Sequence, residues 1–215
     1  MSKKYLYWKY HENIDQVAKS LLLGRVVVGS SDTVLGLLSN TTPIGFDGLS
    51  AIKQRTDKPY IVLIDKIDKL KHFVSIEPVK PVLNLLQICW PGPLTVIFKA
   101  RPGLPDFLLS HDGNIAIRIP DHAGLLRLLS NFEGLFSTSA NLTGEPVPAL
   151  PAELSPQIMH NVDLVILNDY NLEHNASRIL PSTILDCSID QIKLVRSGAY
   201  PLHELEKICG VTILV

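Results

Sequence analysis

The sequence lacks most of the features that mark membrane, secreted and metal-binding proteins. None of its apolar runs approaches the length of about 18 residues that a membrane-spanning helix needs. The N-terminus has lysines but no apolar signal core, so we expect a cytoplasmic protein that does not associate with membranes. Three scattered cysteines, Cys89, Cys187 and Cys209, form no CxxC pair and predict buried free thiols. The seven histidines form no HxH or HExxH pattern, and we expect no metal site made of protein side chains.

Charge of one sign is also missing. The 20 Lys and Arg residues against 21 Asp and Glu residues give a net charge of −1. This balance excludes a general basic field for gripping duplex nucleic acid, so any anion site must be a local cluster. Hydrophobic residues make up 46% of the 215 positions, which excludes a disordered chain.

The apolar pattern predicts an α/β fold. Helices are expected over 14–22, 67–72, 79–89, 121–129 and 203–208, and from 47 or 50 to 55. Strands are expected over 26–28, 60–64, 94–98, 115–119, 162–167, 183–185 and 192–195, with an edge strand over 211–215. Because strands and helices alternate irregularly, we predict a mixed, twisted sheet with helices on its faces, in a single domain over residues 1–215.

Several predicted strands are followed by segments rich in Ser, Thr, Gly and Asn. Such strand ends commonly hold ligands in α/β sheets. The segments 30–37 and 137–144 are the densest in hydroxyl groups, and each is either a polar turn or a ligand cradle. Neither GxxxxGK[ST] nor GxGxxG is present, which excludes an ordinary P-loop and a dinucleotide fingerprint. Lys53 and Arg55 form either a solvated helix face or a pair of cations for a polyphosphate.

Arg118 lies between Ile117 and Ile119 in an apolar strand. A buried charge needs a partner, which is either an internal carboxylate or the carboxylate of a substrate. The segment 90–93, with two prolines around a glycine, is expected to form a rigid turn. Asp121 is expected to cap the helix that follows it.

Seven short motifs in order resemble those of the YrdC family of threonylcarbamoyl-AMP synthases. They stand here as Ser30–Leu37, Lys53 with Arg55, Trp90–Thr95, Ile115–Pro120, Ser139–Gly144, Ser182–Asp186 and Arg196–Gly198. Each is weak alone, but the ordered set is specific and spans about residues 12 to 200. The resemblance implies a YrdC-like twisted mixed β-sheet flanked by helices, with a large open ligand cavity.

The resemblance also implies a reaction and its partners. L-Threonine, bicarbonate and ATP with Mg²⁺ would give threonylcarbamoyl-AMP and pyrophosphate. A downstream transferase complex would then move the threonylcarbamoyl group to tRNA. Two alternatives stay open at this point: a carbamoyl-adenylating enzyme of the hydrogenase-maturation type, and a non-catalytic paralogue that binds nucleotide or RNA (tRNA or double-stranded RNA).

Site residues follow from motif position alone. The residues implied to contact threonine are Thr33, Arg118, Ser137 and Ser182. Those implied on the ATP side are Lys53, Arg55, Asn114, Ser139, Asn141, Val147 and Arg196. Lys53 and Arg55 would act electrostatically, and no acid–base residue is assigned. The segment 144–151 is a candidate cover for the cavity.

This sequence departs from the family pattern at five places, one of which is the segment 56–59, a residue shorter than the common form. Ser30 replaces the proline of the first motif, Ser31 its first threonine, and Leu35 its tyrosine. The segment 61–63, where some members carry a histidine that contacts threonine, is Ile-Val-Leu here.

Overall fold

A single mixed β-sheet runs through the molecule. The computed structural model describes residues 4–54, 59–75, 78–168 and 180–215. The strands are β1 (Lys4–Tyr7), β2 (Val27–Gly29), β3 (Gly36–Asn40), β4 (Ile61–Leu63), β5 (Leu94–Lys99), β6 (Asn114–Arg118), β7 (Leu135–Ser139), β8 (Leu164–Leu167), β9 (Thr183–Asp186) and β10 (Lys193–Arg196). They form a ten-stranded sheet in the order β1-β8-β2-β3-β7-β4-β6-β5-β9-β10. Parallel and antiparallel pairs are interspersed, which confirms the predicted mixed sheet.

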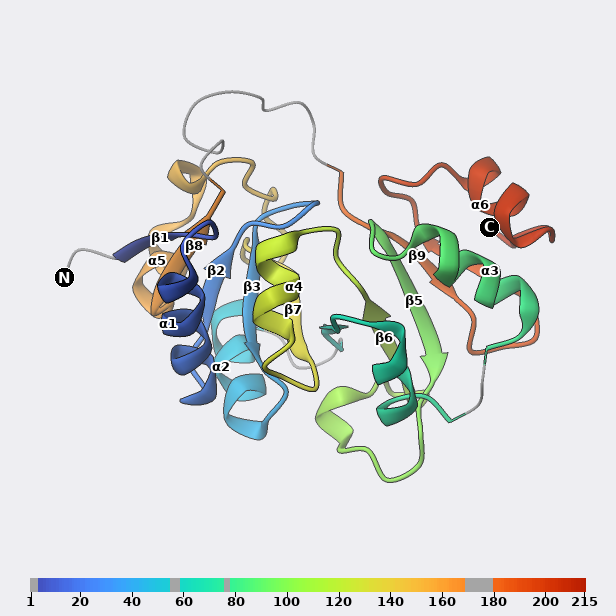
Figure 1. Cartoon of the computed structure of the whole chain (residues 1–215), viewed down its shortest axis with the longest axis horizontal. Coiled ribbons are helices and arrows are strands. Elements are labelled where there is room, and N and C mark those ends of the chain that lie inside the picture. Colours follow the sequence, from blue (N-terminus) through green and yellow to red (C-terminus); the bar gives the residue numbers. More distant parts are fainter. Residues whose placement is uncertain (1–3, 55–58, 76–77, 169–179) are drawn as a thin grey trace.

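Helices cover both faces of the sheet. They are α1 (His11–Leu22), α2 (Pro43–Lys53), α3 (Lys80–Cys89), α4 (Ala123–Leu129), α5 (Pro156–Asn161) and α6 (Leu202–Cys209), with 3₁₀ turns η1 (Ile67–His72), η2 (Asp106–Leu108) and η3 (Pro151–Glu153). Figure 1 shows β1 and β8 toward the end of the molecule that carries the N-terminus, and α3 and α6 toward the end that carries the C-terminus. None of the helices among the described residues is both long and apolar enough to cross a bilayer.

Two hydrophobic cores lie on opposite faces of the sheet. The larger one packs α2, α3, α5 and α6 against strand residues that include Leu37, Val62 and Phe136. The smaller one packs α1 and α4 against strand residues that include Leu38 and Leu63. Neighbouring residues of one strand therefore enter different cores, as the two-residue period of a strand requires.

Helix α2 begins earlier than the sequence predicts. Its first turn is capped by Thr42, whose hydroxyl accepts a hydrogen bond from the backbone N–H of Gly45 at 3.2 Å. Gly45 lowers the helical signal of this segment but is needed there, because a Cβ atom on it would lie 2.1 Å from the carbonyl oxygen of Asn40. The helix ends at Gln54, which has a left-handed φ of 52°.

Three other local expectations need correction. The cap of α4 is His122 rather than Asp121, and the His122 ring accepts from the backbone N–H of Leu125 at 3.0 Å. The segment 211–215 makes only an isolated bridge, between Leu214 and Lys193, instead of an edge strand. The strands β1 and β3 and the helix α5 were not predicted, because each is short or begins with Gly or Pro.

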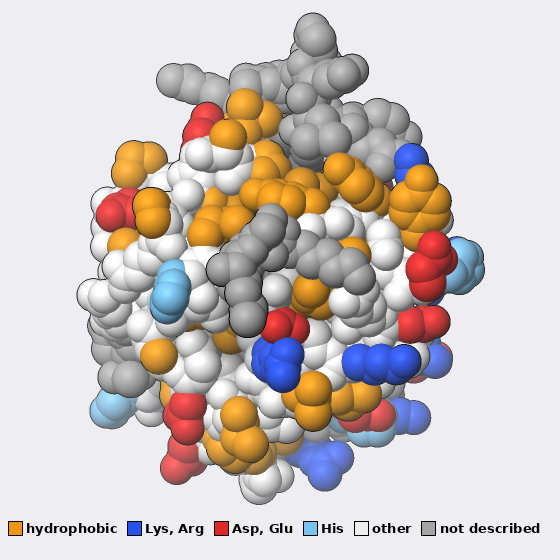
Figure 2. Space-filling model, turned by 90° about the vertical axis from the view of Figure 1, so that its left-hand side faces the viewer, with side chains coloured by type: hydrophobic (Ala, Val, Ile, Leu, Met, Phe, Trp, Pro, Cys, Tyr) orange, Lys and Arg blue, Asp and Glu red, His pale blue; other side chains and the backbone are white. Residues whose placement is uncertain are grey.

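The surface at the β1 end of the molecule is mixed in character. Figure 2 shows hydrophobic side chains gathered over the upper part of this face, with basic and acidic side chains interspersed lower down. The basic groups drawn there thus form no continuous field among the described residues.

Candidate active site

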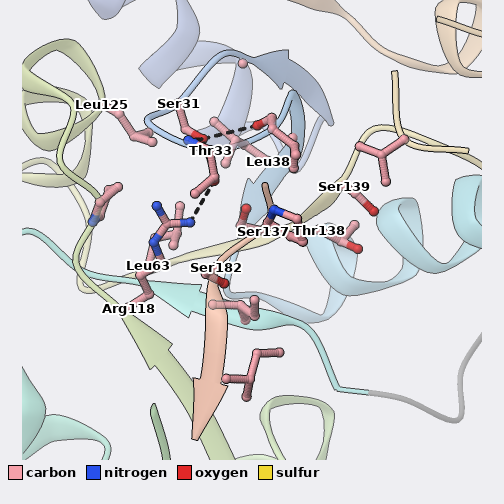
Figure 3. Close-up of a pocket in the computed structure, with 18 of the residues that line it drawn as sticks. Ser31, Thr33, Leu38, Leu63, Arg118, Leu125, Ser137, Thr138, Ser139 and Ser182 are labelled. Carbon is pink, nitrogen blue, oxygen red and sulfur yellow. Dashed lines mark hydrogen bonds between the residues drawn. The ribbon is translucent and has the colours of Figure 1, made fainter. Parts of the chain in front are cut away.

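A cavity of about 500 Å³ opens on the face of the sheet that α1 and α4 only partly cover. Its lining combines hydroxyl groups, two arginines and leucine side chains (Figure 3). The residues that matter most below are Thr33, Gly36, Leu38, Leu63, Arg118, Leu125, Ser137, Ser139, Ser182 and Arg196.

Strand register explains why these residues meet. Leu38 of β3 lies opposite Ser137 of β7, which lies opposite Ile61 of β4. Two residues along β4, Leu63 is paired with Arg118 of β6. Since paired residues in adjacent strands project from the same face, this row forms one continuous floor across the sheet. Farther along, Ile184 of β9 is paired with Arg196 of β10, and both also line the cavity.

Arg118 is held from three directions at the edge of the cavity. Its Nε donates to the carbonyl oxygen of Gly92 at 2.9 Å, and its Nη1 donates to Thr33 Oγ1 at 2.9 Å. Its Nη2 lies 2.5 Å from Asp32 Oδ1, and the two side chains are 7% and 11% exposed. Burial lowers the pKa of Arg118, and the charge of Asp32 opposes that shift. Of the two partners left open by the sequence, the structure shows the internal carboxylate, while Arg118 still lines the cavity.

The hydroxyls of Ser31 and Thr33 form an ordered chain beside Arg118. Ser31 Oγ donates to the carbonyl oxygen of Val34 at 3.1 Å and accepts from the backbone N–H of Thr33 at 3.2 Å. Ser31 Oγ and Thr33 Oγ1 are 3.1 Å apart. Because the Ser31 proton is used on Val34, the Thr33 hydroxyl donates to Ser31 and accepts from Arg118. The hydroxyl that Ser31 supplies in place of threonine thus has a defined partner.

Arg196 and Ser182 face Arg118 from the β9–β10 side of the cavity. Arg196 donates to the Ser182 carbonyl oxygen from Nε at 3.2 Å and from Nη2 at 2.8 Å, and Nη2 also reaches Ser182 Oγ at 3.1 Å. Ser182 Oγ is 2.8 Å from Thr95 Oγ1. Partial burial lowers the pKa of Arg196, and repulsion from Arg118 lowers it further. Two cations that repel each other across a cavity favour an anionic ligand between them.

The loop after β7 meets the end of α2. The Lys53 ammonium donates to the carbonyl oxygens of Ser139 and Asn141 and to Asn141 Oδ1. Ser139 lines the cavity, whereas Lys53 and Asn141 are not among the described residues that line it. Val147, farther along the same connection, also lines the cavity and is 42% exposed.

Asn114 lies away from the cavity, and Arg55 is outside the described residues. Asn114 begins β6 whereas Arg118 ends it, which puts the two about 13 Å apart along the strand at about 3.3 Å per residue. Asn114 is not among the described residues that line the cavity. Arg55 lies outside the described residues, so its assignment stays a prediction.

Two residues of the site were missed from the sequence. Asp32 and Gly92 hold Arg118, yet neither was assigned a role. A signal for Asp32 existed, because it is the acidic residue inside the hydroxyl-rich 30–37 segment and a buried arginine requires a carboxylate.

Comparison with known proteins shows the family to which the chain belongs. Residues 19–198 match the family model Sua5_yciO_yrdC, described as "Telomere recombination". A protein of Haemophilus influenzae named threonylcarbamoyl-AMP synthase is 34% identical over 173 residues, which cover 78% of this chain and 93% of that protein. A Vibrio vulnificus protein of the same name is 27% identical over 190 residues, which cover 86% of this chain and 98% of that protein.

Solved structures show the same fold. The crystal structure of Pyrococcus abyssi Sua5 complexed with L-threonine superimposes with a TM-score of 0.85 at 25% identity, over 99% of this chain and 62% of that chain. This chain therefore spans less than two thirds of the Pyrococcus protein. Escherichia coli YciO superimposes with a TM-score of 0.77 at 22% identity, over 94% of this chain and 98% of that chain. With the family model matched across most of its length, the chain belongs to the Sua5/YciO/YrdC family.

Proposed function

We propose that the chain is a threonylcarbamoyl-AMP synthase, a nucleotidyltransferase that uses L-threonine, bicarbonate and MgATP. The observation that carries the proposal is the arginine pair, Arg118 and Arg196, in a cavity floored by serine hydroxyls and leucines. Threonine, a small zwitterion, and ATP, a polyphosphate, both need cations to bind. The cavity has one arginine on each of two opposite sides. The names of the relatives support the same activity.

Arg118 would bind the threonine carboxylate. Its guanidinium has five N–H groups, and those on Gly92 and Thr33 account for two. The remaining three are on Nη1 and Nη2, and Nη2 also lies against Asp32. A carboxylate would therefore bind beside the Asp32 ion pair, without breaking the bonds to Gly92 and Thr33 that orient the side chain. A guanidinium suits a carboxylate because it donates two parallel hydrogen bonds.

The reaction would proceed in two steps. The threonine nitrogen bonds to the carbon of bicarbonate, and water and a proton leave, which gives a carbamate. A carbamate oxygen then bonds to the α-phosphorus of ATP, and pyrophosphate leaves with the electrons of the broken P–O bond. Neither step needs a nucleophilic side chain, so positioning and charge stabilisation are the contributions expected of the protein.

Arg196 would face the nucleotide, together with Ser139 and Val147. We propose that Mg²⁺ enters as part of the MgATP substrate, because Mg²⁺ in such sites is held mainly by phosphate oxygens and water. The product would pass in the cytoplasm to a transferase complex that acts on tRNA.

The test is pyrophosphate release from ATP, with and without L-threonine and bicarbonate. We expect release only when both are present. Equal release without threonine, or release driven by carbamoyl phosphate, would contradict the proposal. RNA binding with a steep salt dependence and no threonine-dependent release would instead favour a non-catalytic paralogue.

A substitution at Arg118 tests whether this residue binds threonine rather than ATP. Arg118→Lys keeps the charge but loses the planar fork, so we expect L-threonine affinity in calorimetric titration to fall about 10- to 150-fold while ATP affinity is retained. Arg25→Lys is the matched control, since Arg25 forms an exposed ion pair outside this cavity. Parent-like binding of threonine by Arg118→Lys would remove Arg118 from the threonine site.

A further inference from the structure

Lys53 is buried at the end of α2, with its ammonium against the loop that follows β7. We propose that Lys53 is a positioning residue that fixes the 139–145 loop, rather than a ligand of the triphosphate. Lys53 would then affect ATP binding only indirectly, through the position of Ser139. This effect on ATP binding rests on the proposed function, whereas the role of Lys53 in fixing the loop does not.

The hydrogen bonds of the ammonium carry the argument. Lys53 Nζ donates to the Ser139 carbonyl oxygen at 2.9 Å, to the Asn141 carbonyl oxygen at 2.5 Å and to Asn141 Oδ1 at 3.1 Å. A lysine ammonium has three protons, and these three acceptors match them in number. Lys53 is 2% exposed, and a buried ammonium is tolerated only when it is hydrogen-bonded in this way. A phosphate oxygen could bind only by displacing one of these acceptors.

A second link fastens the same loop. Thr143 Oγ1 donates to the Lys53 carbonyl oxygen at 2.6 Å. Both the backbone and the side chain of Lys53 therefore bind the loop, on either side of Asn141.

The link reaches the cavity through Asn141. Ser139 Oγ donates to Asn141 Oδ1 at 2.5 Å, and Asn141 Nδ2 donates to the Glu145 carbonyl oxygen at 2.5 Å. The orientation of the Ser139 hydroxyl, which belongs to the cavity lining, thus depends on an amide that Lys53 holds. In this arrangement Lys53 acts on a bound nucleotide only by setting the position of Ser139.

Hydrogen exchange of the ligand-free protein separates the two roles. A positioning residue matters before any nucleotide binds, whereas a phosphate ligand matters only afterwards. Without ligand, Lys53→Met should accelerate amide exchange in the 139–145 peptide about 10- to 150-fold, the effect of losing a charge-assisted hydrogen bond. Arg196→Met is the contrasting variant: it should weaken ATP binding and leave exchange in this peptide as in the parent.

A second variant covers the case in which Lys53→Met does not fold. Thr143→Val removes the other link and leaves the ammonium in place, and we expect it to accelerate exchange in the same peptide. Parent-like exchange in ligand-free Lys53→Met would overturn the proposal, and weaker ATP binding in the same variant would then identify Lys53 as a direct phosphate ligand. Where Lys53→Met is unfolded, parent-like exchange in Thr143→Val would overturn it. Failure of the pyrophosphate assay for the parent protein would refute the proposed function alone, because the exchange measurement uses no substrate.

Discussion

Arg118 Nη2 and Asp32 Oδ1 are 2.5 Å apart beneath the cavity, and Arg118 is the polar partner of Asp32 among the described residues. Removing the carboxylate leaves a buried guanidinium without its counter-charge. We therefore expect Asp32→Asn to lower the free energy of unfolding by about 3 kcal/mol in urea denaturation.

The exposed pair of Arg25 and Asp163 provides the control. Its side chains are 54% and 30% exposed, so Arg25→Gln should cost less than about 1 kcal/mol. Equal losses in the two variants would mean that Asp32 does not compensate the charge of Arg118.

Gly36 leaves space in the cavity floor. A Cβ atom there would lie 3.4 Å from the Thr138 carbonyl oxygen and 3.5 Å from Ser137 Oγ, which are ordinary contacts. Gly36→Ala should therefore fold with stability unchanged or raised by up to about 1 kcal/mol, while its methyl group reduces the space for ligand. We expect L-threonine affinity in calorimetric titration to fall at least about tenfold, since overpacking costs about 1–3 kcal/mol.

Gly45→Ala is the contrasting variant for this prediction, because its Cβ would lie 2.1 Å from a backbone oxygen and should destabilise the fold itself. If Gly36→Ala bound threonine like the parent, the ligand would not approach this part of the floor.

Three leucine side chains form an apolar part of the cavity wall. Leu38, Leu63 and Leu125 belong to one packed cluster and also line the cavity, and Leu63 is paired with Arg118 across β4 and β6 (Figure 3). An apolar wall of this kind distinguishes threonine from serine by one methyl group, worth about 1–3 kcal/mol or roughly 10- to 200-fold. Pyrophosphate release with each amino acid should show a preference in this range. A preference beyond about 1000-fold would require a polar contact to the side chain.

Ser30, which stands where the family pattern has proline, joins three segments in this chain. Its hydroxyl accepts from Trp8 Nε1 and from the backbone N–H of Asn168, both at 3.0 Å. Its own N–H donates to the Ile166 carbonyl oxygen at 3.0 Å. Ser30→Ala should cost about 1–3 kcal/mol for each donor left unsatisfied, measured by urea unfolding with tryptophan fluorescence.

Ser30→Pro should destabilise the chain further, since it also removes the N–H. The control is Ser130→Ala on the surface, expected within about 0.5 kcal/mol of the parent. A stabilised Ser30→Pro variant would contradict the role given to this hydroxyl.

The free energy of unfolding should fall at high pH because two cysteines are wholly or partly buried. Burial raises the pKa of Cys89 to about 11 and that of Cys187 to about 12. Both groups are protonated in the fold at pH values where an unfolded thiol ionises, near pH 8.5. Their contribution to stability is therefore complete below about pH 8.5 and is lost as the pH rises toward 11 to 12.

Urea denaturation at pH 7.5, 9 and 10.5 measures this loss. Cys89→Ala and Cys187→Ala should each flatten the dependence above pH 9. Both thiols should also react slowly with a disulfide reagent at pH 8 in the folded protein and quickly once it is unfolded. Rapid labelling of the folded protein at either position would contradict the raised pKa values.

Most of the sheet could be predicted because its strands are apolar runs bounded by Gly, Pro or polar residues. β4, β5 and β6 fall within two residues of the predicted limits. The start of α2 could not be predicted from the sequence. Gly45 is required there because its backbone packs closely against Asn40, and helix propensity does not encode such a contact.

The cavity was only partly predictable for a similar reason. The position of Arg118 in an apolar strand marked it as a residue with a partner, but its pairing with Asp32 spans 86 positions and depends on how β6 meets the 30–37 segment. The direction of Lys53 depends on where α2 ends, which a lysine on a helix does not reveal.

In the central strands, successive side chains point to opposite faces of the sheet and so have different roles. Leu37, Phe136, Val62 and Ile117 are fully buried in the larger core, while Leu38, Ser137, Ile61 and Arg118, each next to one of them in the chain, line the cavity. Residues that line the cavity thus alternate along the same strands with residues that form the larger core. Substitutions at the cavity-lining positions can therefore change binding preferences and leave the larger core intact. A one-residue insertion in β6 would instead turn its core residues toward the cavity and its cavity residues toward the core.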